Sequence, residues 1–310
     1  MNKITVINPG LFSTFQDEGR ENHQHIGMPV GGAMDKYALQ LANYLVSNQT
    51  NEACLEMTLT GATLRFNFDT NIAITGGKCV VLLNGKQAKS HRTLVIKTND
   101  QIDIQNITEG ARSYLAIAGG FNLPIIMASK STYIKGKLGG FKGRALMVGD
   151  EIEINKISKK CKRRRISRKH IPQYPQHVEL RIIPGPEKDR FEWEGIKHFL
   201  CSDYELSPQC DRMGYRLNGP KIGQINNNAD IISSAISFGT IQVPSDGKPI
   251  IMMADRQTTG GYTRIAQVVS ADHHILAQLK PGDKIRFKEV TLNEAHQLYK
   301  KMKDILNKYQ

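Results

Sequence analysis

Paired cysteines and long apolar runs are both missing from this chain of 310 residues. Its five cysteines are odd in number and form no C-x-x-C pair, which disfavours a disulfide framework and a zinc site. No apolar run approaches the ~18 to 20 residues of a membrane helix, so a membrane protein is not expected. The start of the chain also lacks the apolar segment of a secretory signal. We therefore expect free thiols and a cytoplasmic location.

Several sequence motifs of known chemistry are absent as well. The chain has neither a P-loop pattern nor a G-x-G-x-x-G turn after a strand, which excludes two common modes of nucleotide binding. It has no G-x-S-x-G and no H-E-x-x-H pattern. His23 and His25 have no evident third partner, so a polar surface loop is favoured over a metal site there. We predict no metal.

Positive charge is abundant but unevenly distributed. The formal net charge is +13, from 42 Lys and Arg against 29 Asp and Glu. Residues 159–169, KKCKRRRISRK, hold eight of the basic residues and no acid, and the remaining 34 basic residues exceed the acids by only five. Because this run has no interleaved aromatic residues and no attached binding motif, a solvated linker is favoured over a nucleic-acid partner.

Short β-branched segments separated by turn residues dominate the chain and predict a mainly β protein. Three segments have helical spacing instead. Residues 34–48 form one predicted helix, with Asp35 as a candidate N-cap. Residues 292–309 form a second, which starts with a capping box of Thr291 and Glu294. The helical pattern of residues 188–200 is weaker. The strand segments are KITVI, ATLRF, NIAIT, CVVLL, TLVIK, QIDIQ, SYLAIA, EIEI, VELRII, GTIQV, IIMMA, IAQVV and KIRF.

The two halves of the chain echo each other in short matches. ITVINPG resembles LRIIPG, and GDEIEI resembles GDKIRF, although such turn and strand fragments also recur by chance. The predicted organisation is an N-terminal β lobe at 1–157, a basic linker at 158–176, a C-terminal β lobe at 177–290 and a C-terminal helix at 291–310.

Four polar clusters interrupt the apolar segments: STFQDEGR, GMPVGGAMDKYA, CDRMGYRLNGP and ADRQTTGGYTRIAQV. Each has a structural explanation of its own. Asp35 can cap a helix, Asp211 and Arg212 can pair in a turn, and Gly260 and Gly261 can supply positive φ in a hairpin. The alternative is that the clusters line one functional cleft.

Taken together and in order, the motifs resemble the allophanate hydrolase subunit 2 family, which is the biotin-dependent carboxyltransferase-like family. The resemblance covers about residues 4–288, and Thr263 stands where the family usually has proline after GGY. It implies a fold of two cyclophilin-like β-barrel lobes with a few peripheral helices. The matching segments are PGLFSTFQDEGR, GGAMDKYALQLANYLVSN, LEMTLTGATLRF, GPEKDRF, SPQCDRMGYRLNGP, GTIQVPSDGKPIIMMADRQTTGGY and LAQLKPGDKIRF.

The family contains Kip antagonist proteins and the C component of ATP-dependent 5-oxoprolinase, so the resemblance implies a protein that helps open 5-oxoproline to L-glutamate within a complex. It also implies partners: a subunit-1-type protein (Kip inhibitor type, or the B component of 5-oxoprolinase) and an A component of the LamB/YcsF type. ATP is the expected cofactor of such a complex. Two alternatives stay open. One is a carboxyltransferase acting on urea or a similar amide with biotin supplied in trans, and the other is a regulatory antagonist of a kinase inhibitor.

Either reaction requires fixed donors aimed at a developing anion. Arginine forks suit a carboxylate or phosphate, neighbouring aspartates orient them or act as base, and glycines let backbone N–H groups approach a ligand. The chain alone is expected to be inactive. The catalytic candidates are Asp211, Arg212, Asp255 and Arg256, and the substrate-binding candidates are Arg20, Asp35, Tyr215, Gln257, Thr258, Thr259, Gly260, Gly261 and Tyr262.

Overall fold

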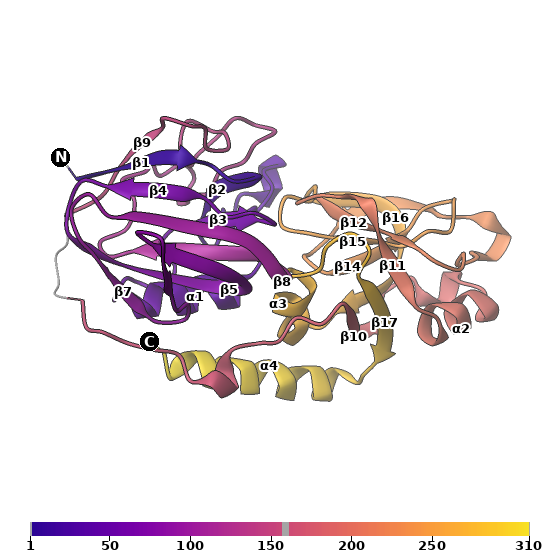
Figure 1. Ribbon diagram of the computed structural model, residues 1–310. Coiled ribbons are helices and arrows are strands. Elements are labelled where there is room, and N and C mark those ends of the chain that lie inside the picture. The colour runs from indigo at the N-terminus through magenta and orange to yellow at the C-terminus, as the bar shows by residue number, and fades with distance from the viewer. Residues whose placement is uncertain (1, 157–160, 310) are drawn as a thin grey trace. The chain divides into compact units, whose positions relative to one another are not determined.

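The computed structural model describes residues 2–156 and 161–309. Strands account for 39% of it and helices for 17%, which confirms the mainly β prediction. The chain forms two compact units (Figure 1). The first comprises Met1–Glu21, Gly31–Tyr174 and Ile305–Gln310, and the second comprises Asn22–Val30 and Pro175–Asp304. Of the predicted linker 158–176, residues 158–160 lie outside the described residues, and 161–174 belong to the first unit.

The first unit is built on one strongly curled sheet of nine strands in the order β2-β3-β8-β4-β1-β9, with β5, β6 and β7 attached through β8. One edge of β8 pairs with β5, and its other edge is shared between β3 and β4. No pairing among the described strands closes this sheet into a barrel. Its strands are β1 (Lys3–Asn8), β2 (Phe12–Gln16), β3 (Cys54–Thr58), β4 (Thr63–Phe66), β5 (Thr70–Leu83), β6 (Lys86–Ala88), β7 (Thr93–Ile96), β8 (Gln101–Ile117) and β9 (Glu151–Glu153).

The strands β5 and β8 correct the sequence-based prediction. NIAIT and CVVLL are one continuous strand of 14 residues, and QIDIQ and SYLAIA are one of 17 residues. The register between β5 and β8 shifts near Gly76 and Lys78, which marks bulges in the pair. Because an extra residue in one strand bends it, these bulges curl the sheet. The glycine and polar residues that predicted a strand boundary instead form a bend within one strand.

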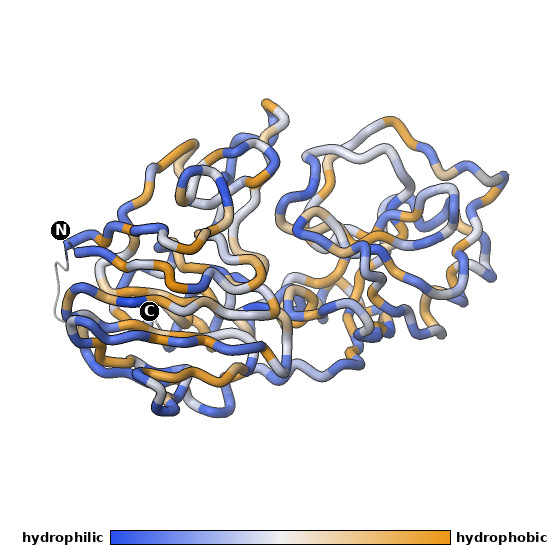
Figure 2. The backbone as a smooth tube through the Cα atoms, turned by 45° about the horizontal axis from the view of Figure 1, so that its top comes forward, coloured by the Kyte–Doolittle hydropathy of each residue, from blue (hydrophilic) through white to orange (hydrophobic). Residues whose placement is uncertain are grey.

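The core of the first unit lies inside the curl. Ile4 and Val6 of β1 point inward, and Leu64 and Phe66 of β4 face them from the next strand. Hydrophobic and hydrophilic residues alternate along many of these strands (Figure 2), as expected for sheets with one buried face. The helix α1 (Lys36–Leu45) also contributes buried residues, and Asp35 caps it by accepting a hydrogen bond from Ala38 N at 2.9 Å, as predicted.

The second unit contains a closed barrel. Seven strands form a ring in the order β10-β17-β11-β12-β15-β14-β16, and β16 pairs back to β10 to complete it. β13 lies outside the ring and pairs with β16. These strands are β10 (His177–Pro184), β11 (Tyr204–Cys210), β12 (Gly214–Asn218), β13 (Asp230–Ala235), β14 (Thr240–Val243), β15 (Ile250–Met252), β16 (Thr259–Val268) and β17 (Lys284–Glu289).

The echo between the two halves has a structural counterpart with one difference. In each unit the two echoing segments pair with each other, as β1 with β9 and as β10 with β17. The first pair is antiparallel and the second is parallel. In the second unit β10 also pairs with β16, which closes the ring, whereas no pairing among the described strands closes the first unit.

Helices support both units. In the second unit, α2 (Trp193–Cys201) packs Phe199 against Phe287 of β17 with ring centroids 4.5 Å apart. The capping box predicted for α4 (Leu292–Asn307) is present, since Glu294 N donates to Thr291 Oγ1 and Thr291 N donates to Glu294 Oε2. No helix among the described residues has the length and apolar character needed to cross a membrane. The remaining short helices are α3 (His273–Leu276), η1 (Gln24–Ile26), η2 (Arg168–His170), η3 (Lys188–Arg190), η4 (Ile225–Asn227) and η5 (Ser270–Asp272).

The bend in β5 can be tested with two glycines that both have positive φ. A Cβ at Gly76 would lie 2.5 Å from the Arg112 carbonyl oxygen, whereas a Cβ at Gly85 would meet nothing within 4 Å. Gly85→Ala should therefore cost only the backbone strain of about 1 kcal/mol. Gly76→Ala should cost roughly 1–3 kcal/mol more, because the backbone must also move. Guanidinium unfolding of both variants measures the difference, and equal losses would show that the bend tolerates a side chain.

Candidate functional site

The stretch 254–268 combines a loop and a strand. The apolar strand β15 ends at Met252, and β16 begins at Thr259, so Asp255 and Arg256 lie on the connecting loop. Gly260 and Gly261 lie inside β16 and have no positive φ, so the hairpin-turn interpretation of this glycine pair is wrong. The polar side chains therefore gather where a core strand of the barrel ends.

Arg212 and Asp255 form a buried, bidentate ion pair. Arg212 Nε donates to Asp255 Oδ2 at 2.9 Å, and Arg212 Nη2 donates to Asp255 Oδ1 at 3.0 Å. The two side chains are only 9% and 8% exposed. The backbones join as well, since Asp255 N donates to the Arg212 carbonyl oxygen at 2.7 Å. The pair thus fastens the β11–β12 turn to the β15–β16 loop.

Arg256 differs from Arg212, because within the described part of the chain its side chain donates to backbone carbonyl groups and not to a carboxylate. Its Nε donates to the carbonyl oxygen of Ile236 and its Nη1 to that of Met253, each at 3.2 Å. Among the described residues no carboxylate forms an ion pair with it. Burial lowers the pKa of this guanidinium to about 10. Because desolvation disfavours the charged form, a bound anion would be strongly favoured here.

The contacts of Asp211 and Tyr215 stabilise the turn and the core of the second unit. Asp211 is exposed, and its Oδ1 accepts hydrogen bonds from Met213 N at 2.7 Å and Gly214 N at 3.1 Å, which stabilises the β11–β12 turn. Tyr215 is 2% exposed and belongs to the barrel core. Its hydroxyl donates to the Leu279 carbonyl oxygen at 3.5 Å. Tyr215 is therefore buried away from any ligand at the surface, and the predicted catalytic role of Asp211 stays a prediction.

The other candidates on this stretch lie at the surface or next to it. Gln257 and Thr259 are exposed, and Tyr262 is 41% exposed, so all three are accessible to a ligand. Thr258 is half-buried and accepts a backbone hydrogen bond from Ile236 N. Since Ile236 also receives the Arg256 side chain, the loop is held at two points on one residue.

Gln242 was missed by the sequence analysis. It is 2% exposed, and its Nε2 donates to the Tyr262 carbonyl oxygen at 3.2 Å. A Cβ at Gly260 would lie 2.5 Å from that same nitrogen, so the glycine makes room for the amide. The sequence signal that could have identified Gln242 is an amide side chain inside the apolar run GTIQV. Gln242 therefore supports the strand that carries the exposed Tyr262.

Arg20 lies in the first unit and is 0% exposed. Its Nη2 donates to the Ser131 carbonyl oxygen, and a Cβ at Gly139 would lie 2.3 Å from that nitrogen. Nearby, Asp17 accepts hydrogen bonds from Ser129 Oγ at 2.6 Å and from Lys130 N at 2.6 Å. Asp17 and Ser129 were not among the predicted residues, although Asp17 stands in the STFQDEGR cluster.

Asp35 is also buried in the first unit, where it caps α1 and receives a hydrogen bond from Tyr174 Oη at 3.4 Å. Its own N–H donates to Tyr114 Oη, which in turn donates to Glu56 Oε2 at 2.7 Å. These hydrogen bonds form one connected polar network in the interior of the first unit. No group of His, Cys, Asp and Glu in the described parts of the chain is arranged to hold a metal ion.

The candidates thus fall into two groups. Arg20 and Asp35 belong to the first unit, and the residues from Asp211 to Tyr262 belong to the second. Within the second unit the structure brings Arg212, Asp255 and Arg256 onto two joined loops. That both groups line a single cleft stays a prediction.

The ion pair leads to a stability prediction that compares two aspartates. Asp255→Ala should destabilise the protein by about 3–5 kcal/mol, because it removes the carboxylate that pairs with the buried Arg212 guanidinium. Asp211→Ala removes only exposed turn hydrogen bonds and should cost about 0.5–1.5 kcal/mol. Thermal or urea unfolding distinguishes them. Similar losses for both variants would mean that the buried pair contributes no more than the turn.

Comparisons with known proteins agree with this architecture. Residues 26–289 match the family described as "Carboxyltransferase domain, subdomain A and B". The chain is 37% identical over 292 residues to the C component of 5-oxoprolinase from Escherichia coli, covering 94% of this chain and 93% of that protein. It is 34% identical to the protein of the same name from Haemophilus influenzae, covering 96% and 94% of the two chains.

A solved structure has the same fold. The urea carboxylase of Kluyveromyces lactis superposes with a TM-score of 0.94 at 29% identity, covering 99% of this chain and 29% of that one. The similarity therefore extends over both units, although the yeast enzyme is much longer. These matches confirm the family resemblance inferred from the sequence motifs, and this chain belongs to the family of carboxyltransferase domains with subdomains A and B.

Proposed function

We propose that this chain works as the C component of an ATP-dependent 5-oxoprolinase, which opens 5-oxoproline to L-glutamate together with partner proteins. The support is twofold. Two relatives with that name align with nearly the whole of this chain and nearly the whole of their own. The β15–β16 loop also carries the residues that an anionic, amide-containing substrate requires.

Arg256 is the observation that carries the proposal. 5-Oxoproline bears a carboxylate, and attack on its ring amide places negative charge on the carbonyl oxygen. A buried guanidinium that has only backbone carbonyl partners is a preorganised receptor for such an anion, because its desolvation has already occurred in the folded protein. Ring opening adds water across the amide C–N bond, and donors fixed on the developing oxyanion lower the barrier to that addition.

The residues around Arg256 have supporting roles in this proposal. Both oxygens of Asp255 are occupied by Arg212, which favours orientation of the loop over action as a free base. Thr259 and Tyr262 are exposed beside the loop and are available to hydrogen-bond or cover a flat substrate. Arg212 and Asp255 are thus positioning residues, and Arg256 is the proposed anion receptor.

The proposal also includes partners. The name of the two bacterial relatives designates one component of a multi-protein enzyme. We infer that this chain acts with a B component of the Kip inhibitor type and an A component of the LamB/YcsF type. ATP would be consumed by the assembled complex. The chain has no P-loop sequence, so we expect no turnover from this chain alone.

A second candidate function is transfer of a carboxyl group to urea or a similar amide. The TM-score of 0.94 with a urea carboxylase favours it, because the fold of both units is shared. Such a reaction would bring biotin on a separate carrier. Fold similarity is weaker support than full-length similarity to a named enzyme component, since one fold hosts several reactions.

The role of Arg256 can be tested by substitution in the assembled enzyme. Arg256→Ala should lower turnover by ~10²- to 10³-fold, as expected for loss of one donor to a developing oxyanion. Arg256→Lys keeps the charge without the planar fork and should recover part of the activity. The assay is glutamate formation from 5-oxoproline and ATP with both partner proteins. Near-normal turnover by a folded Arg256→Ala protein would contradict the proposed role of Arg256 as the anion receptor.

Dependence on partners is a separate prediction. The isolated chain should form no glutamate from 5-oxoproline and ATP, and activity should appear when both partner proteins are added. A parallel reaction with urea, bicarbonate, ATP, a biotin carboxylase and a biotinylated carrier tests the second candidate. Robust turnover by the isolated chain would contradict the partner requirement, and carboxylation without glutamate formation would favour carboxyl transfer.

A further inference from the structure

The described part of the basic run, which we call the basic strap (residues 161–170), is attached to the edge of the first sheet. Arg165 lies opposite Arg92 in an antiparallel bridge. Thr93 N donates to the Arg164 carbonyl oxygen, and Ile166 N donates to the His91 carbonyl oxygen, each at 3.0 Å. The strap thus extends the sheet beyond β7, which pairs with β5 on its other side.

Specific contacts hold the strap in place. Arg164 donates from Nη1 to the Tyr44 carbonyl oxygen at 2.7 Å, and its guanidinium lies 4.4 Å from the centre of the Tyr44 ring. Ile166 is 5% exposed and packs inward. Tyr309 Oη accepts a hydrogen bond from Ser167 N at 3.2 Å. The described strap is therefore attached to the first unit, and the prediction that the basic run is a solvated linker stays a prediction.

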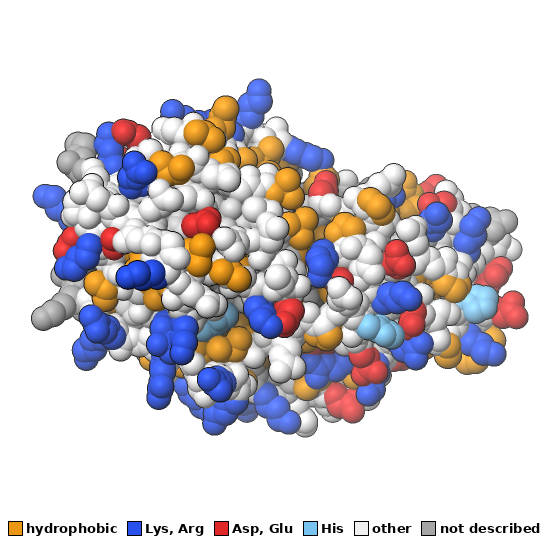
Figure 3. Space-filling view, viewed as in Figure 1, with side chains coloured by type: hydrophobic (Ala, Val, Ile, Leu, Met, Phe, Trp, Pro, Cys, Tyr) orange, Lys and Arg blue, Asp and Glu red, His pale blue; other side chains and the backbone are white. Residues whose placement is uncertain are grey.

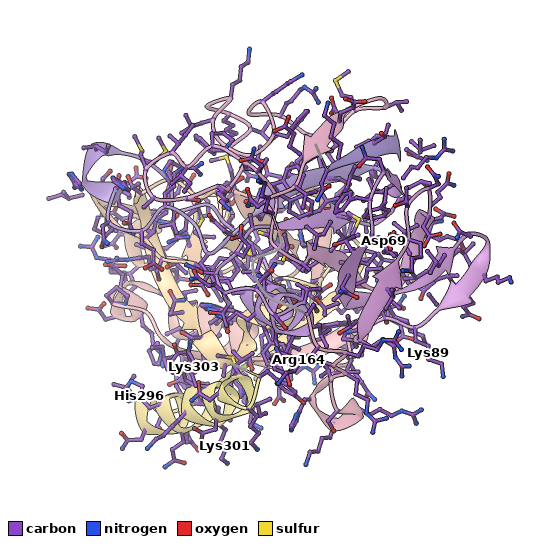
Figure 4. All side chains as sticks on the ribbon, turned by 90° about the vertical axis from the view of Figure 1, so that its left-hand side faces the viewer. Asp69, Lys89, Arg164, His296, Lys301 and Lys303 are labelled. Atoms are coloured by element: carbon purple, nitrogen blue, oxygen red, sulfur yellow. The ribbon has the colours of Figure 1, made fainter. Side chains whose placement is uncertain are left out.

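The outward face of the strap and its neighbours carries many exposed basic side chains. Figure 3 shows Lys and Arg side chains gathered along the lower left of the molecule, and Figure 4 labels Arg164 of the strap and Lys89 near β7. None of the exposed members makes an ion pair with a carboxylate of the described chain. These members are Lys89, Arg92, Lys162, Arg163, Arg165, Arg168, Lys169 and Lys308.

Two features of this surface lower the stability of the protein unless a ligand compensates for them. Arg92 and Arg165 are directly opposite each other across the bridge, and like charges in that position destabilise a sheet. In a bridge of this type the N–H and C=O groups of Arg165 point away from β7. Within the described residues, these two backbone groups form no hydrogen bond. Among the described residues, the sheet edge is thus open at Arg165, and neither Arg92 nor Arg165 pairs with a carboxylate there.

We propose that the basic strap binds an extended acidic segment of a partner protein, which adds as a further strand beside Arg165. Its carboxylates would pair with Arg92, Arg163 and Arg165, and its backbone would complete the open edge. This inference does not depend on the proposed enzymatic function. Basic side chains can also protect a sheet edge against aggregation, and that simpler role requires no ligand.

The observations favour a peptide over a nucleic acid. Single-stranded nucleic acids bind where aromatic side chains offer stacking surfaces. The aromatic residues beside the strap are engaged inside the unit, with Tyr44 contacting Arg164 and the Tyr309 ring, and Tyr309 only 8% exposed. A nucleic acid also cannot continue the hydrogen-bond ladder of a sheet, whereas a peptide backbone can.

The test is a binding measurement by fluorescence anisotropy with the full chain and a labelled polyglutamate peptide. Binding should be detected at low salt and should weaken as salt increases. The double variant Arg92→Gln/Arg165→Gln should lose about tenfold or more in affinity, because two charge-assisted contacts are removed. A thermal melt confirms that this variant, altered only at exposed positions, remains folded.

A control variant and a control peptide separate the proposal from simple charge attraction. Lys197→Gln/Lys248→Gln removes the same charge from exposed positions in the second unit and should change the affinity less than about twofold. The same peptide with alternate backbone nitrogens methylated keeps every carboxylate but cannot donate along the edge. It should bind several times more weakly than the unmodified peptide.

Four results would overturn the inference. The first is no binding of polyglutamate at low salt, which would leave edge protection as the role of the strap. The second is equal losses in the strap variant and the control variant. Equal affinity for the methylated peptide would exclude strand addition, and tighter binding of an oligothymidylate of the same length would assign the surface to nucleic acid.

Discussion

Burial of charge at the ends of strands is the constraint on which the second unit depends. An ion taken out of water costs several kcal/mol unless a partner offsets that loss. Arg212 and Asp255 offset it for each other, and their bidentate contact joins two loops that are 43 residues apart in the chain. Arg256, the next residue in the chain, is also buried, but its partners among the described residues are the backbone carbonyl groups of Ile236 and Met253. The ion pair joins the two loops, and its neighbour Arg256 is the proposed anion receptor.

The first unit uses buried polar groups differently. Asp17 and Arg20 contact the segment around Ser129 and Ser131 mainly through its backbone and hydroxyl groups. That segment includes Met127 and Ala128, two non-glycine residues with positive φ. Such residues are rare without support from their surroundings. The buried polar side chains of the first unit therefore stabilise a loop of unusual backbone shape, whereas in the second unit they join two loops next to the proposed receptor Arg256.

The two units differ in strand direction and in whether the sheet closes. Echoing segments at the start and end of each unit pair side by side, but the pair is antiparallel in the first unit and parallel in the second. Closure in the second unit comes from β16, whose ten residues contact β10, β13 and β14. In the first unit the long strands are β5 and β8. Their bulged pairing curls the sheet but does not join its edges.

The sequence alone determined the features that depend on neighbouring residues. Strand content followed from alternation, the caps at Asp35 and Thr291 followed from side chains that reach only three residues along the chain, and the family followed from ordered motifs. Residues with the same local signature, such as Asp211 and Asp255, could not be distinguished in this way. Tertiary structure decided that one caps an exposed turn and the other pairs with a buried arginine. It also decided that two pairs of predicted strands are single bent strands and that the basic strap is a sheet edge. Burial and cross-strand pairing arise between residues distant in the chain, and no local pattern encodes them.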